Sequence, residues 1–344
     1  MAPITASRVI NSPGIVSAGT RGRVEEAIEE LGYVPNRVAR SLRLKRTHTL
    51  ALVVTDITNP FWTTVARGVE DAAQGAGFNV ILCNTDESEA KQQRYLDVLL
   101  QKRVDGILLV PAGTSTELGD WIRKQSTPMV VLDRRIRCAQ VDFVCGDSEG
   151  GAYQLIRHLL SLGHRRIAVL SGPKDISTAE DRVTGYRKAL IEAGLEVRSD
   201  WVRYGEFNQE SGYEMAQQVL AALPRPTALF AANNFIAIGA LRALRHAGLR
   251  VPEDLSVVAF DDLTSGLVIE PFLTVVDQPA YEMGRRATEL LLARLSGSAT
   301  NGYREIVLPT QLAVRRSSSP CGSSGQPVYP LPEAIALGVR GGGS

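Results

Sequence analysis

The 344-residue sequence contains only four cysteines and four histidines, and only 6% of its residues are aromatic. The cysteines show no CxxC spacing, which favours a reducing cytoplasm. No apolar run is long enough to span a bilayer, and the N-terminus lacks the basic and then apolar layout of a secretory signal. The HExxH, P-loop and Rossmann GxGxxG patterns are also missing. We therefore expect a cytoplasmic protein without catalytic residues, metal, cofactor or membrane contact.

The charge is distributed unevenly along a chain of ordinary globular composition, 44% hydrophobic and 22% charged. The length allows about two or three domains. The net charge is +1, yet residues 1–47 carry eight basic and four acidic side chains, which leaves a net −3 on the remainder. A basic N-terminal segment on a slightly acidic body is typical of a DNA-binding segment joined to a domain for a neutral ligand.

Residues 35–47 carry five positive charges and no negative ones. Pro35 suits the first turn of a helix, and Val38 and Leu42 would then share one face. A short basic helix with a protruding leucine can hold phosphates while its apolar side chain unstacks a base step in the minor groove. A solvated linker between domains is the alternative, and composition alone leaves both open.

Several strings around this stretch stand in a characteristic order: Ile4-Thr-Ala-Ser-Arg-Val-Ile-Asn11, Val16-Ser-Ala-Gly-Thr-Arg21, Leu31-Gly-Tyr33, Pro35-Asn36 and Ala39-Arg-Ser-Leu42. Together they resemble the DNA-binding headpiece of the lactose-repressor (LacI) family. The resemblance implies a recognition helix in the major groove and a hinge helix from Pro35 to Leu42. The DNA contacts that it implies are Thr5, Ser7, Arg8, Asn11, Arg37, Arg40, Leu42 and Arg43.

The beginning of the chain departs from this family pattern. The family has a further helix and turn before the recognition helix, whereas this sequence starts with Met1-Ala-Pro-Ile4. Either the start codon was assigned too far downstream or the headpiece is truncated. We expect an all-α partial helix-turn-helix headpiece over residues 1–34, followed by the hinge helix and linker over 35–47.

From Thr49 onward, short apolar strands alternate with amphipathic helices, which predicts βαβ units and parallel sheets. A first alternation has strands at 50–55, 79–83, 106–110 and 129–132, with helices at 63–76 and 87–102. A second has helices at 149–162 and 178–193, with strands at 166–170, 201–204, 228–231 and 256–260. A helix at 280–295 and a strand near 303–308 should return to the first lobe. Three crossings between two lobes would make a hinged cleft.

This part resembles the type I periplasmic sugar-binding fold as the LacI family uses it. The resemblance implies an α/β effector domain over residues 48–316. Its first lobe would comprise about 48–147 and 279–306, and its second about 148–276 and 307–316. Residues 317–344 are rich in Ser, Gly and Pro, and we expect them to be a disordered tail.

Sugar sites combine aromatic faces with planar polar groups that bond hydroxyls, and open α/β sheets bind ligands beyond the carboxyl ends of their strands. Asn59, Phe61 and Trp62 follow the first strand, where buried aromatics at a helix entry are the alternative. Asp133 and Arg134 could be hydroxyl ligands or a surface ion pair, and Arg182 could be a helix-surface charge. In order, the ligand positions of ribose-binding proteins and sugar-responsive repressors match Asn59, Phe61, Trp62, Asp133, Arg134, Arg182, Asn233, Asp261 and Gln278.

One departure disfavours ribose itself, because Pro111 stands where ribose-type proteins have an Asn. The function we predict is a DNA-binding transcriptional regulator, with repression the expected mode. Its homodimer would bind double-stranded, pseudo-palindromic operator DNA under the control of a small carbohydrate between the lobes. The alternative is a stand-alone sugar-binding protein, against which residues 3–47 and the missing signal peptide argue.

Overall fold

The computed structural model describes residue 9 and residues 16–32, 46–113, 115–137, 140–263, 271–299 and 302–322. Near the N-terminus it contains helix α2 (Ala18–Glu30), on which Val24 is buried. The expected DNA contacts lie outside the described residues: Thr5, Ser7, Arg8, Asn11, Arg37, Arg40, Leu42 and Arg43. They therefore remain predictions.

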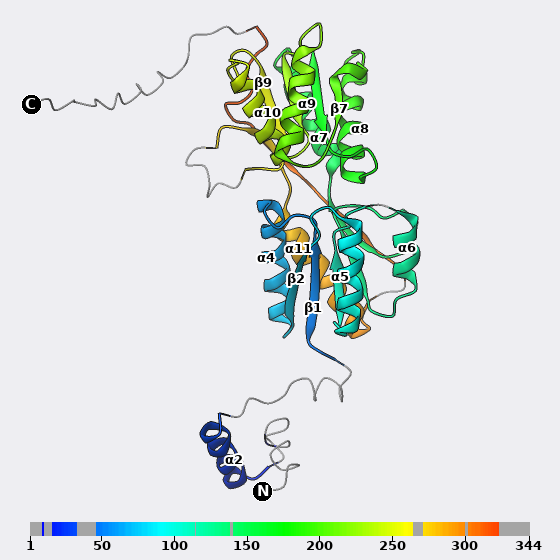
Figure 1. The fold of residues 1–344 in the computed structure, drawn as a ribbon, viewed down its shortest axis with the longest axis vertical. Coiled ribbons are helices and arrows are strands. Elements are labelled where there is room, and N and C mark those ends of the chain that lie inside the picture. The colour runs from blue at the N-terminus through cyan, green and yellow to red at the C-terminus, as the bar shows by residue number, and fades with distance from the viewer. Residues whose placement is uncertain are drawn as a thin grey trace, which may run out of the picture.

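The first lobe is built on a parallel sheet with the strand order β11-β5-β4-β3-β1-β2. Alternate residues of a strand face opposite sides, so Leu50 and Leu52 pack under one helical layer and Ala51 and Val53 under the other. Helices α4 and α11 form the first layer, and α5 and α6 form the second (Figure 1). The elements are β1 (Thr49–Val54), α4 (Pro60–Gly75), β2 (Asn79–Asn84), α5 (Glu89–Gln101), β3 (Gly106–Leu109), α6 (Thr116–Arg123), β4 (Met129–Leu132), β5 (Asp142–Gly146), α11 (Ala280–Ser296) and β11 (Glu305–Leu308).

The second lobe repeats this three-layer design with the strand order β12-β10-β9-β8-β6-β7, in which only β12 runs antiparallel. Helices α7 and α8 cover one face, and α9 and α10 cover the other. The elements are α7 (Ser148–Ser161), β6 (Ile167–Ser171), α8 (Ser177–Glu192), the 3₁₀ turn η2 (Ser199–Trp201), β7 (Val202–Tyr204), α9 (Gln209–Ala221), β8 (Ala228–Ala231), α10 (Asn234–His246), β9 (Ser256–Phe260), β10 (Thr274–Asp277) and β12 (Gln311–Ala313).

The chain passes between the lobes three times, as the alternation predicts: from β5 to α7, from β10 to α11, and from β11 to β12 (Figure 1). Helix α11 returns to the first lobe and packs closely on α4. A Cβ atom at Gly68 would lie 2.0 Å from the Tyr281 carbonyl oxygen, and one at Gly284 would lie 2.1 Å from that of Val65. The two helices can therefore touch only because each presents a glycine.

Two sequence-based expectations need correction. Helix α4 begins at Pro60 rather than at 63, because the Asn59 side chain accepts a hydrogen bond from the Phe61 amide and Pro60 fits the first turn. The expected tail does not begin at Ser317, which is fully buried: its Oγ donates to the Val257 carbonyl at 2.6 Å and accepts from the Thr274 amide at 2.7 Å. Residues 317–322 therefore belong to the second lobe, and 323–344 lie outside the described residues.

Candidate ligand-binding site

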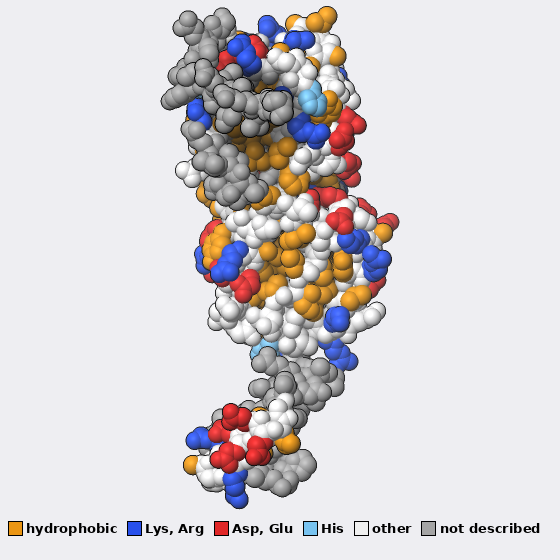
Figure 2. Space-filling view, turned by 60° about the vertical axis from the view of Figure 1, so that its left-hand side comes forward, with side chains coloured by type: hydrophobic (Ala, Val, Ile, Leu, Met, Phe, Trp, Pro, Cys, Tyr) orange, Lys and Arg blue, Asp and Glu red, His pale blue; other side chains and the backbone are white. Residues whose placement is uncertain are grey.

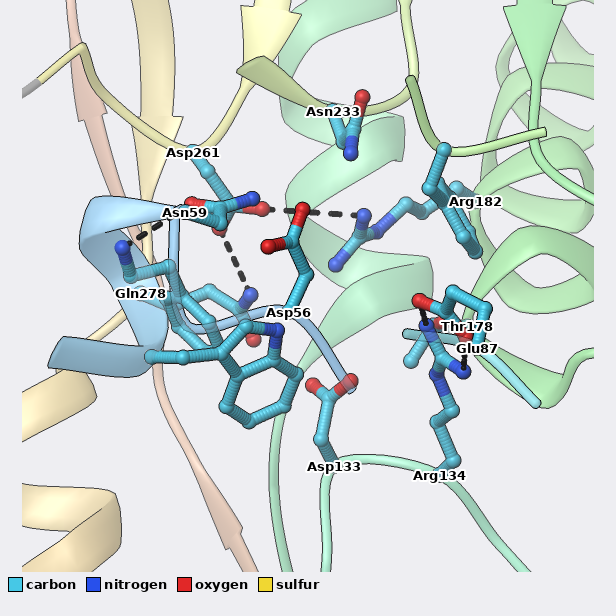
Figure 3. A pocket seen from close by; sticks show the side chains of 13 residues that line it. Asp56, Asn59, Glu87, Asp133, Arg134, Thr178, Arg182, Asn233, Asp261 and Gln278 are labelled. Carbon is cyan, nitrogen blue, oxygen red and sulfur yellow. Dashed lines mark hydrogen bonds and ion pairs between the residues drawn. The ribbon is translucent and has the colours of Figure 1, made fainter. Parts of the chain in front are cut away.

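A pocket between the lobes gathers polar side chains that follow strands of both sheets (Figure 3). The carboxyl ends of parallel strands share one edge, and here the two edges face each other. All nine residues that the sequence singled out as ligand contacts line it. The full lining is Asp56, Asn59, Phe61, Trp62, Glu87, Asp133, Arg134, Thr178, Arg182, Phe207, Asn233, Asp261 and Gln278.

Three carboxylates of this pocket stand on unusual backbone. Glu87, Asp133 and Asp261 have φ values of 56°, 63° and 67°, in the left-handed region that residues with a Cβ rarely adopt. Each follows a strand: β2, β4 or β9. Such strain persists only where the surrounding structure holds it, and it gathers at functional sites. The strand ends therefore turn sharply and present their carboxylates to the pocket.

Arg134 is buried in a bidentate ion pair with Glu87, with Nη1 2.5 Å from Oε2 and Nη2 2.7 Å from Oε1. Its Nη1 also donates to the Pro111 carbonyl at 3.1 Å. From the second lobe, the Phe207 ring lies 5.3 Å from the guanidinium carbon. A surface ion pair between Asp133 and Arg134 is thus the wrong interpretation: both side chains are buried, and the bidentate partner of Arg134 is Glu87.

Arg182 provides the matching guanidinium in the second lobe. It is 3% exposed, so the interpretation as a helix-surface charge is wrong. Its Nη1 donates to the Ala232 carbonyl at 2.6 Å and lies 3.8 Å from Asp261 Oδ2. The Phe260 ring lies 3.9 Å from its guanidinium carbon. Its buried Nε has no hydrogen-bond partner among the described residues.

Asp133 and Asp261 are held differently. Asp261 accepts a hydrogen bond from Gln278 Nε2 at 2.7 Å, whereas the buried Asp133 carboxylate has no hydrogen-bond partner among the residues described. Burial raises the pKa of Asp133 to about 6, against the opposing charges of Arg182 and Arg134. Burial likewise raises the pKa of Asp261. Both carboxylates would gain from hydroxyl or other donors placed in the pocket.

The positions of Phe61 and Trp62 agree with both interpretations that the sequence left open, aromatics buried at a helix entry and aromatics that face a ligand. Trp62 is 5% exposed and belongs to the core under α4, whereas Phe61 is less buried. The two rings pack edge to face, with their centroids 4.7 Å apart. Both also line the pocket. They therefore form an apolar wall that the core supports, a suitable surface for the C–H face of a sugar ring.

Four residues that line the pocket were not predicted from the sequence: Asp56, Glu87, Thr178 and Phe207. Asp56 and Glu87 follow β1 and β2, so the strand-end rule applied to every strand would have found them. Phe207 lies in the loop after β7, far from the other members in sequence, and no local signal marks it. Pro111 is not part of the lining, but its carbonyl helps to hold Arg134.

The side chains that line the site are hydrogen-bonding and stacking groups. Among the described residues, no three His, Cys, Asp or Glu side chains are arranged to hold a metal ion. In the same part of the chain, no helix is both long and apolar enough to cross a membrane. The arrangement is suited to holding a polyhydroxylated ligand.

Two family models match consecutive parts of the chain. Residues 2–36 match the bacterial regulatory proteins of the lacI family, and residues 47–314 match the periplasmic binding proteins and sugar-binding domain of the LacI family. Among characterised relatives, the transcriptional regulator CelR of Thermobifida fusca is 40% identical, covering 91% of this chain and 94% of its own length. The transcriptional repressor PurR of Photobacterium profundum is 37% identical with the same coverage.

Solved structures agree with these matches. A CelR–cellobiose complex has a TM-score of 0.73 at 38% identity, covering 91% of this chain and 94% of the other. The lac repressor dimer bound to operator and the anti-inducer ONPF has a TM-score of 0.80 at 29% identity, covering 92% and 95%. The fold, the two family models and relatives that extend over nine-tenths of the chain lead to one conclusion: this protein belongs to the LacI family of DNA-binding transcriptional regulators and is not an enzyme.

Proposed function

We propose that the protein is a cytoplasmic, homodimeric regulator that binds a pseudo-palindromic operator and responds to a small neutral sugar. The pocket between the lobes supports the ligand proposal. Carboxylates, amides and two guanidiniums line it, together with the aromatic rings of Phe61 and Trp62. These are the groups that bind sugar hydroxyls and cover the apolar face of a ring. The CelR–cellobiose complex, and a LacI-family regulator of Enterococcus faecium with bound ribose, support this ligand class.

Ligand control follows from the position of the pocket. Its lining comes from both lobes, so a sugar bound there contacts both of them at once. The three crossing segments provide the hinge. Sugar binding then sets the angle between the lobes, and the ligand shifts an equilibrium between two arrangements.

The DNA-binding segment is tied to the first lobe where it enters the sheet. The Asp105 carboxylate accepts hydrogen bonds from the amides of Thr47, at 3.0 and 3.1 Å, and Thr49, at 3.1 Å. Arg46 Nη2 donates to the Leu295 carbonyl on α11 at 3.0 Å. A rotation of the first lobe therefore carries residue 46 with it, and in a dimer it changes the separation of the two hinge helices.

Exposed apolar side chains on the first lobe support dimerisation. Figure 2 shows hydrophobic side chains gathered on this lobe, and Ile81, Leu82 and Val98 are 36%, 43% and 38% exposed. Ile81 and Leu82 lie on β2, the edge strand of the sheet, which natural proteins usually cover or charge. A second copy would cover this edge with the two-fold symmetry that a palindromic site requires.

Two measurements on the full chain test the proposal. Calorimetry against pentoses, hexoses and disaccharides, including ribose and cellobiose, should identify a neutral sugar that binds. Fluorescence anisotropy with operator-like DNA should then show an affinity that this sugar changes. Sugar binding without DNA binding would favour the stand-alone sugar-binding protein. Binding of a purine, an amino acid or a phosphorylated compound, with no free sugar bound, would refute the neutral-sugar assignment.

A further inference from the structure

The charges that line the pocket are unequal. Of its thirteen lining residues, four are acidic and two are basic. The acidic residues are Asp56, Glu87, Asp133 and Asp261, and the basic ones are Arg134 and Arg182. Figure 3 shows the two guanidiniums on the same side of the pocket as Thr178 and Glu87. Whether an anionic ligand can bind depends on how far the two arginines are already neutralised.

The terminal nitrogens of Arg134 are engaged before any ligand arrives, whereas its buried Nε has no hydrogen-bond partner among the described residues. Both of its terminal nitrogens bond Glu87, and Nη1 also bonds the Pro111 carbonyl. In the second lobe, Arg182 faces Asp261 at 3.8 Å and donates to the Ala232 carbonyl. Both arginine side chains are 4% exposed, while those of Glu87 and Asp261 are 31% and 8% exposed, so solvent screens the pair of Arg182 less than that of Arg134. Among the described residues, the carboxylates of Asp56 and Asp133 form no ion pair, so the pocket retains negative charge.

Glu87 is held in place by its loop. Its amide donates to the Thr55 carbonyl at 3.2 Å, and the next residue, Ser88, donates to the Thr85 carbonyl at 3.0 Å. Ser88 also caps helix α5. The left-handed backbone at Glu87 is thus fixed from both sides, and it directs the carboxylate at Arg134. The loop therefore fixes the position from which Glu87 pairs with Arg134.

We infer that Glu87 sets the charge preference of this site: by neutralising Arg134, it makes the pocket select uncharged sugars over anionic ones of the same shape. The inference rests on the proposed function and concerns which members of the sugar class bind. A phosphate or carboxylate group entering the pocket meets the carboxylates of Asp56 and Asp133. Each guanidinium there already faces a carboxylate, Glu87 for Arg134 and Asp261 for Arg182. Without the charge of Glu87, Arg134 becomes a free cation that can receive the anion.

The test compares neutral and anionic partners on the full chain. Calorimetry would use D-ribose with D-ribose 5-phosphate, and D-glucose with D-glucuronate. In the wild type, the neutral member should bind at least about tenfold more tightly than its anionic partner. Glu87→Gln keeps the shape and one acceptor but removes the charge, and it should reduce this ratio by about tenfold or more. Glu214→Gln, at an exposed position on α9 outside the pocket, is the control and should leave the ratio unchanged.

A second variant separates charge from position. Glu87→Asp keeps the negative charge on a shorter side chain and should retain the preference for the neutral member. An unchanged ratio in a folded Glu87→Gln protein, or equal binding of both members by the wild type, would overturn the inference while leaving the sugar proposal intact. If no sugar of either charge bound to the wild type, the proposed function itself would fail, and the inference with it.

Discussion

The amide side chains of Asn59 and Asn234 hydrogen-bond each other across the two lobes. Each Nδ2 donates to the other residue's Oδ1 at 3.0 Å, and both residues are buried. The two Oδ1 atoms also accept from the amides of Phe61 and Phe235, at the starts of α4 and α10. This reciprocal pair exists only while the lobes are together. It therefore helps to hold the pocket closed through contacts within the protein.

Removing this pair should favour the open arrangement. Asn234→Leu keeps a helix-compatible side chain of similar size but leaves the Asn59 amide without its partner, at a cost of about 1–3 kcal/mol in the closed form. Small-angle scattering of the ligand-free protein should then give a larger radius of gyration. Gln217→Leu, at an exposed position on α9 outside the pocket, is the control and should leave the radius unchanged. Identical scattering from Asn234→Leu and the wild type would contradict this role.

Asp261 should contribute strongly to sugar affinity. It accepts from Gln278 at 2.7 Å and faces Arg182, so Asp261→Ala deprives both partners and any sugar hydroxyl of their acceptor. The expected loss is about 1.5–3 kcal/mol, or roughly tenfold to a hundredfold in affinity. Calorimetry would measure it, with Asp120→Ala on the exposed face of α6 as the control. Wild-type affinity in Asp261→Ala would exclude this residue from the sugar site.

Asp133 should lower the stability of the unliganded protein at neutral pH. Its pKa rises from 3.8 to about 6 because it is buried, so between these values the folded chain keeps a proton that the unfolded chain has lost. The free energy of unfolding therefore falls as the pH rises through this window. Asp133→Asn removes the effect and should be more stable than the wild type by on the order of 1–3 kcal/mol at pH 7.

Denaturant unfolding of wild type and Asp133→Asn from pH 4 to pH 7 would measure this difference. The two stabilities should be close near pH 4, separate as the pH rises to about 6, and differ by a constant amount above that pH. Asp120→Asn, on an exposed carboxylate, should follow the wild type at every pH. A constant difference across the range would show that burial of the Asp133 charge is not its source.

Leu42 should act as the apolar wedge of the hinge helix. Leu42→Ala removes the side chain expected to open a base step, and operator affinity should fall by about tenfold or more. Leu31→Ala, at a side chain 79% exposed after α2, provides a matched leucine control. Fluorescence anisotropy at fixed salt would compare the two, because phosphate contacts make the affinity salt-dependent. Wild-type binding by Leu42→Ala would refute the wedge.

The edge strand β2 should lie in the dimer interface. Leu82→Lys places a charge on this exposed apolar edge, and the dimer should dissociate at least partly at micromolar concentration, since a buried unpaired charge is costly. Leu223→Lys changes a leucine of the second lobe that is 83% exposed, and it should leave the dimer intact. Sedimentation velocity distinguishes these outcomes. A wild-type monomer at this concentration would contradict the dimer altogether.

The order of strands and helices could be predicted from the sequence because it depends on local patterns. Buried parallel strands such as Leu50 to Val54 appear as short continuous apolar runs, and amphipathic helices separate them. Polar residues directly after such runs, such as Asp133 and Asp261, must meet at the carboxyl edge of a sheet. That rule, together with the family resemblance, placed nine side chains that the tertiary structure brings around one pocket.

Which side chains neutralise one another was decided only by the tertiary structure. Glu87 and Arg134 are 47 positions apart, and Asn59 and Asn234 are 175 apart. No local pattern relates such residues, because their contact depends on how separate loops turn and how two lobes close. Phe207 reaches Arg134 from the other lobe for the same reason. The kinds of groups in the site thus follow from the sequence, whereas the charge that a ligand meets depends on pairings made through space.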